Sequence, residues 1–85
     1  MSKIVIDERF LPIRRLISSW FVDDYKTIRG CYPSKVEQKN FGYVLNNIVR
    51  NFLRVADEQG QDKAADAARG VVNLYLLKAS NRMMT

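Results

Sequence analysis

Apolar residues recur every three or four positions along the first third of the chain, and this spacing most constrains its fold. They are Ile13, Leu16, Ile17, Trp20, Phe21, Tyr25 and Ile28. Such spacing, kept over several turns, predicts an amphipathic helix. Pro12 suits the first helical position, and Gly30 suits the left-handed residue that often follows a helix. We therefore expect a first helix over residues 12–29, with Trp20 and Phe21 towards the core.

Two more helices follow, each bounded by its own signals. Ser34 is followed three residues later by Glu37, the pattern of a capping box, and Gly60 ends the next apolar pattern. These signals predict a second helix over 35–59 and a third over 62–80. The apolar side chains of the third helix are small near the turn and bulky further on. A short turn at Gly60 makes these two helices antiparallel neighbours. The prediction is all-α: one three-helix domain over residues 1–85.

Residues 3–7 precede the helices and favour a different conformation. Three consecutive β-branched residues favour an extended strand, but a lone strand is not stable by itself. We expect an extended N-terminal arm that either packs on the helices or pairs with another chain.

The inventory of side chains excludes several kinds of function. The 85 residues include no histidine and a single cysteine, Cys31. A His-dependent triad, an internal disulfide and a cysteine-based zinc site are therefore impossible within this chain. No phosphate-binding glycine motif is present. We expect no catalysis, no metal and no cofactor. A lone cysteine, without a signal peptide or a long apolar run, fits a cytoplasmic protein with no membrane segment.

Polar residues on the second and third helices suggest a first candidate site. In an antiparallel hairpin, the residue pairs at equal levels are Asp57–Lys63, Arg54–Asp66, Arg50–Arg69 and Asn47–Asn73. The first two are ordinary ion pairs. Two arginines at one level repel each other unless an acid lies between them, so Arg50 and Arg69 could bind a phosphate or carboxylate. The alternative is a solvated face on which the two side chains point apart.

Basic residues concentrate around the first connection and suggest a second candidate site. Between residues 25 and 56 there are six basic residues and a single acidic residue, Glu37, and Tyr25, Tyr32 and Tyr43 lie in the same stretch. This composition is typical of a nucleic-acid contact surface, although basic residues also suit a helix C-terminus. A helix-turn-helix is disfavoured, because two aspartates open the third helix. The candidate nucleic-acid or anion-binding residues are Lys26, Arg29, Lys35, Lys39, Arg50, Arg54 and Arg69.

The apolar residues exceed what three short helices can bury, which suggests an interface. Helices apolar on several sides pack against something larger. The candidate interface residues are Phe41, Tyr43, Val49, Leu53, Leu74, Tyr75 and Leu77. We expect self-association or docking on a larger protein, unless the arm and the first helix cover the surplus. The leading hypothesis is a small non-catalytic regulatory, adaptor or inhibitor protein. A nucleic-acid-binding accessory protein and a binder of phosphate-bearing small ligands are the alternatives.

Overall fold

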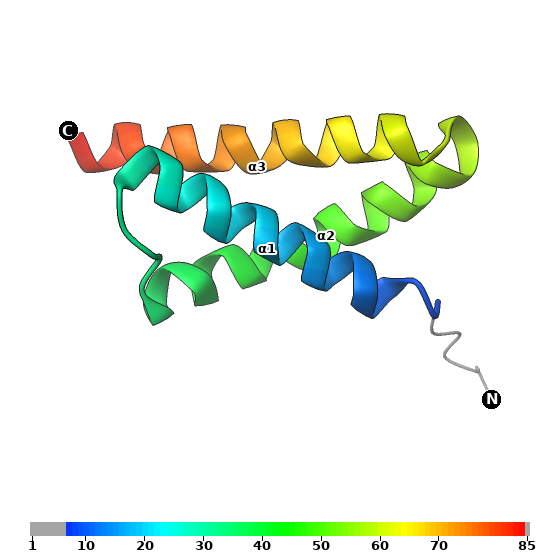
Figure 1. Ribbon diagram of the computed structural model, residues 1–85, viewed down its shortest axis with the longest axis horizontal. Helices are drawn as coiled ribbons and strands as arrows, with labels where there is room; N and C mark the ends of the chain where they lie inside the picture. Colours follow the sequence, from blue (N-terminus) through cyan, green and yellow to red (C-terminus); the bar gives the residue numbers. More distant parts are fainter. Residues whose placement is uncertain (1–6, 85) are drawn as a thin grey trace.

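The computed structural model describes the backbone of residues 7–84 and the side chains of residues 7–78, and it confirms the all-α prediction. Helix α1 spans Phe10–Arg29, α2 spans Lys35–Gln59 and α3 spans Gln61–Met84. Helices α2 and α3 meet at Gly60 and diverge towards their other ends (Figure 1). Residues 3–6 of the expected arm lie outside the described residues. No described helix is both long enough and apolar enough to cross a membrane.

Helix α1 begins two residues earlier than predicted. Pro12 stands in the first turn rather than opening it, which costs no hydrogen bond because the first N–H groups of a helix have no intrahelical partner. Asp7 organises this end: its side chain accepts the Arg9 N–H at 2.9 Å and its carbonyl accepts the Phe10 N–H at 3.0 Å. The helix ends at left-handed Gly30, as predicted.

The α2/α3 hairpin follows the predicted signals more closely. Ser34 caps α2 by accepting the Glu37 N–H at 3.2 Å. Gly60 alone separates α2 from α3, with φ +98° and ψ 160°. Helix α3 therefore starts one residue before the predicted 62, and it runs to Met84 rather than to 80.

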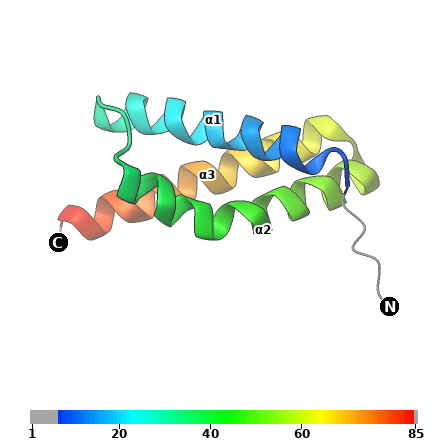
Figure 2. The same ribbon diagram turned by 90° about the horizontal axis from the view of Figure 1, so that it is seen from below.

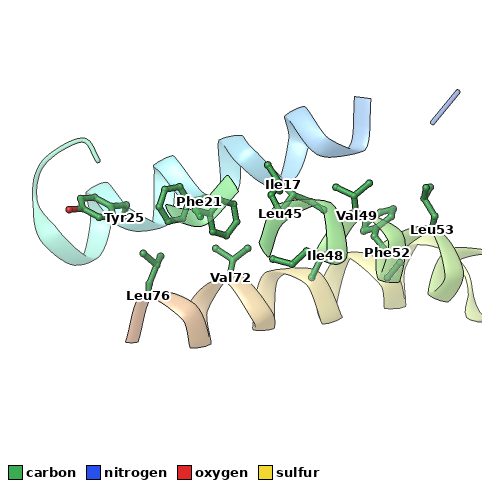
Figure 3. Packing of buried hydrophobic residues seen from close by; sticks show 13 residues of the cluster. Ile17, Phe21, Tyr25, Leu45, Ile48, Val49, Phe52, Leu53, Val72 and Leu76 are labelled. Carbon is green, nitrogen blue, oxygen red and sulfur yellow. The ribbon is translucent and has the colours of Figure 1, made fainter. Parts of the chain in front are cut away.

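The core lies where α1 crosses one face of the hairpin. Phe21 of α1 stacks on Phe41 of α2, with ring centroids 4.1 Å apart, and both meet the ring edge of Tyr75 from α3. Near the turn α3 buries Ala64 and Ala68, and further on it buries larger side chains, as its composition predicted. Figure 3 shows the cluster along the three helices.

One expectation about helix packing needs correction. Phe21 is buried as predicted, but Trp20 is only half-buried at the edge of the core. Gly70 of α3 lies in open space: a Cβ there would meet nothing within 4 Å, so no part of the described chain requires a glycine at this position.

Candidate functional site

Helix α1 covers only one face of the α2/α3 layer (Figure 2). The other face carries a groove of about 470 Å³ with no α1 residue in its lining. Its floor is apolar, and its one charged side chain is Lys78. The lining residues are Val44, Asn47, Ile48, Asn51, Val71, Leu74, Tyr75 and Lys78. We call this the hairpin groove.

The predicted interface residues divide into two groups. Leu74 and Tyr75 line the groove, and Leu74 is 58% exposed. Leu77 is 52% exposed on the same helix, outside the groove lining. Tyr43 is 71% exposed, on a different side of α2. The prediction is wrong for Phe41, Val49 and Leu53, which are buried in the core. These three cannot reach a partner, because α1 already packs on that side of α2.

The seam between α1 and α2 is strongly basic. Arg14 of α1 donates a hydrogen bond to the Asn46 side chain of α2 at 3.1 Å. This contact shows which sides of the two helices lie next to each other. On α2, Lys35, Lys39, Tyr43, Asn46 and Arg50 are spaced by three or four residues and share one flank. On α1, Arg15 and Lys26 are exposed, and Lys26 bonds to Tyr32 in the connection to α2. We call this surface the basic face, and it consists of Arg14, Arg15, Lys26, Lys35, Lys39 and Arg50, with Tyr32 and Tyr43.

Four of the seven predicted anion-binding residues therefore share one surface, but three do not. The Arg29 guanidinium lies over the ring of buried Tyr25, and two of its nitrogens are buried. Arg54 bonds to Asn51 at 2.6 Å and pairs with Glu58 at 3.5 Å on the outer side of α2. Arg69 lies at the seam between α1 and α3. Sequence reasoning missed Arg14 and Arg15. Both stand outside the apolar stripe of α1, but only the packing of α1 on α2 shows that they adjoin the other cations.

The paired-arginine site was predicted wrongly. The Arg69 guanidinium lies 3.7 Å from Asp24 of α1 and over the Trp20 ring. Arg50 instead bonds to Asn47 on its own helix at 3.1 Å. The acidic partner of Arg69 is thus Asp24 of α1, and the two arginines do not face each other. The register of the α2/α3 hairpin could not predict this, because it does not say where α1 packs. Asp24 is only 17% exposed, so this pair contributes to packing rather than forming an open pocket.

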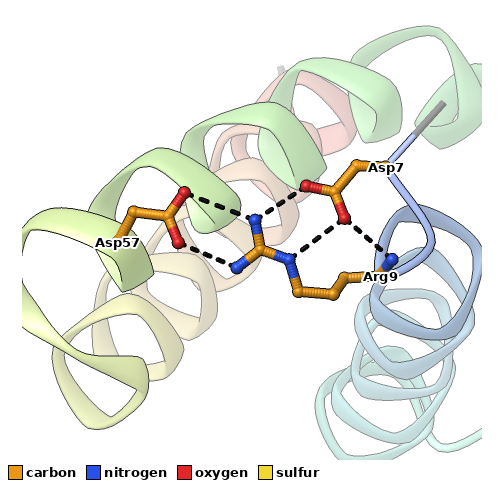
Figure 4. A network of polar contacts seen from close by, with 3 residues as sticks. All are labelled: Asp7, Arg9 and Asp57. Carbon is orange, nitrogen blue, oxygen red and sulfur yellow. Dashed lines mark hydrogen bonds and ion pairs between the residues drawn. The ribbon is translucent and has the colours of Figure 1, made fainter. Parts of the chain in front are cut away.

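The expected ion pairs Asp57–Lys63 and Arg54–Asp66 are also replaced. Arg9, just before α1, bridges Asp7 and Asp57 with bonds of 2.7 and 2.8 Å (Figure 4). The side-chain hydrogen bond from Arg9 lowers the pKa of Asp7 to about 2 and also lowers the pKa of Asp57. These contacts raise the pKa of Arg9 in return. The network ties the start of α1 to the end of α2.

This network predicts a pH-dependent contribution to stability. A carboxyl whose pKa is lower in the folded state stabilises the fold above its ordinary pKa, and the contribution disappears as pH falls through the folded pKa. For Asp7 that window runs from its ordinary value of 3.8 down to about 2. In an NMR titration, the Asp7 carboxyl should have its midpoint near 2 in the wild type and near 3.8 in Arg9→Gln. Identical midpoints in both proteins would show that Arg9 does not hold Asp7.

Comparison with known proteins adds no functional assignment to these surfaces: no family model matches the chain, and no curated protein or solved structure is significantly similar to it.

Proposed function

We propose that this chain is a small non-catalytic binding protein that acts by protein–protein association, and that a second copy of the chain packs on the exposed side of α3, at the edge of the hairpin groove. The observation that carries the proposal is the exposed apolar side of α3. Leu74, which also lines the groove, and Leu77, which lies outside its lining, remain more than half exposed there. Exposed apolar surface of this kind is typical of an interface.

The exposed side of α3 is complementary to itself. Ala67, Gly70, Leu74 and Leu77 follow one another at helical spacing on this side and are all exposed. A two-fold axis at the level of Val72 along the helix would place α3 antiparallel to its copy. Leu74 would then lie opposite the partner's Gly70, and Leu77 opposite the partner's Ala67. Each large side chain then meets a small one. Such an isologous contact closes as a dimer.

Two further features fit a second copy on this side of α3. Gly70 costs about 1 kcal/mol relative to alanine inside a helix, and no described residue of its own chain uses the space that it leaves. A leucine from a closely approaching helix would use it. The net charge of +5 also opposes self-association unless charges avoid the interface. Ala67, Gly70, Leu74 and Leu77 carry no charge, whereas six basic residues lie on the basic face.

Size-exclusion chromatography with light scattering tests the proposal over a range of concentrations. The wild type should have twice the 9.9 kDa mass of one chain. Leu74→Glu should be monomeric because it places a charge in the interface. Gly70→Leu should be monomeric because it fills the space needed by the partner's Leu74, although its own chain leaves room for the substitution. Circular dichroism should show both variants to be as helical as the wild type.

Val36→Glu is the matched control. Val36 is also exposed and apolar, but it lies in the first turn of α2 and outside the groove. This variant should remain dimeric. A wild type that is monomeric at all concentrations, or a Gly70→Leu variant that dimerises normally, would reject a second copy as the occupant. A monomer that instead binds a larger protein through Leu74 would reject it as well.

A further inference from the structure

We infer that the basic face is a second binding surface, which takes the phosphate backbone of nucleic acid. It lies at the α1/α2 seam, whereas the hairpin groove lies between α2 and α3. The two surfaces therefore use different helix pairs. This inference stands whether or not the chain dimerises.

Most acidic side chains lie away from the basic face; the exception on α1 is Asp23, which lies one turn before Lys26 but forms no ion pair with it. Asp24 pairs with Arg69 at the α1/α3 seam, Asp7 and Asp57 hold Arg9, and Glu58 pairs with Arg54. Glu37 stands two positions from both Lys35 and Lys39, which turns it to the opposite side of α2. Among the described side chains, no carboxylate lies within ion-pair distance of Arg14, Lys35, Lys39 or Arg50. The charge on this face is therefore available to an external polyanion.

The arrangement of the cations suits an extended polyanion better than a small ion. One flank of α2 carries Lys35, Lys39, Tyr43, Asn46 and Arg50 in succession. At 1.5 Å per residue this row is about 22 Å long. Arg14, Arg15 and Lys26 of α1 add charges beside it. A small phosphate would need groups that converge on one point, whereas a nucleic-acid backbone presents repeated charges along a line.

Exposed tyrosines between the cations favour nucleic acid over a membrane. Tyr32 and Tyr43 are 67% and 71% exposed, and Lys26 bonds to the Tyr32 hydroxyl at 3.2 Å. Such rings can stack on bases, and their hydroxyl groups can bond to phosphates. An anionic membrane would also attract the cations, but stable anchoring needs a row of apolar side chains beside them. The exposed apolar residues form no such row. On α1, Leu11, Leu16 and Ile28 lie on different sides of the helix, Val36 stands in the first turn of α2, and Leu74 and Leu77 belong to α3.

Fluorescence anisotropy with labelled mixed-sequence duplex DNA and single-stranded RNA tests the inference. The wild type should bind at least one of them at about 50 mM salt and lose most of its affinity by about 200 mM. Lys35→Gln/Lys39→Gln should weaken binding at low salt by about tenfold or more. It should also reduce the slope of log affinity against log salt by about 2, the effect of two lost phosphate contacts.

Arg54→Gln/Lys63→Gln is the matched control, because it removes the same two positive charges from residues outside both the basic face and the groove lining. It should keep nearly wild-type affinity. Undetectable binding to both nucleic acids at low salt would reject the inference. Equal weakening in the two double variants would also reject it, because net charge alone would then explain binding. Binding to phosphatidylserine vesicles without binding to nucleic acid would likewise count against it, since the surface would then take a membrane. None of these outcomes bears on the mass measured for the dimer.

Discussion

Phe21→Ala is expected to cost about 3–5 kcal/mol of unfolding free energy, a typical value for removing a buried aromatic side chain. Phe21 is 1% exposed and contacts rings from all three helices: Tyr25 on its own helix, Phe41 on α2 and Tyr75 on α3. A domain of this length has roughly 4–13 kcal/mol of stability in total. The variant should therefore lose between about a quarter and all of the stability, and urea unfolding followed by circular dichroism should show a much lower midpoint.

Tyr43→Ala provides the control, since it also removes an aromatic ring from a helix. Tyr43 is largely exposed and packs on no core residue. Its loss should change stability by no more than about 0.5 kcal/mol, as for most surface substitutions. Similar losses in the two variants would contradict the position of the core. A small loss in Phe21→Ala alone would show that Phe41 and Tyr75 repack over the cavity.

Gly60→Ala is expected to cost about 1–3 kcal/mol, because the cost of this change depends on backbone conformation rather than on space. Gly60 adopts φ +98° and ψ 160°, a region open almost only to glycine, and a Cβ there would meet nothing within 4 Å. The whole connection between α2 and α3 is this one residue, so the strain cannot spread into a longer loop. Urea unfolding would measure the loss directly.

Gly42→Ala is the opposite case and serves as its control. Gly42 lies within α2 with an ordinary helical φ, and it too has open space around its Cα. Alanine should stabilise the protein by about 0.5–1 kcal/mol, because glycine loses more backbone entropy in a helix. Destabilisation by both substitutions would mean that crowding, rather than the φ angle, decides their effect.

Local signals predicted the secondary structure well. The end of α1 at Gly30, the Ser34 cap and the Gly60 turn depend on residues next to one another, so the linear order contains the necessary information. The same holds for the buried alanines near the turn and the larger residues beyond it. Helix ends were less certain: Pro12 tolerates any position in the first turn, and no residue near 80 stops α3.

The candidate surfaces were harder to predict, because each depends on where α1 packs. Periodicity shows that α2 is apolar on most sides, but not which side α1 covers. Val49 and Leu53 were therefore assigned to an interface, although they are buried. Arg69 was assigned to a pocket with Arg50, although Asp24 of α1 is its neighbour. Arg14 and Arg15 were missed for the same reason.

The sequence by itself determined three helices, a short turn at Gly60 between the last two, and an excess of both apolar and basic residues. These follow from spacing, capping and composition, which act over a few positions along the chain. Only the tertiary structure decided how that excess divides among the surfaces. Because α1 covers one face of the hairpin, Leu74 and Leu77 remain exposed on another side, and cations from α1 and α2 meet along a third. Contacts between helices set this division, and no local pattern encodes them.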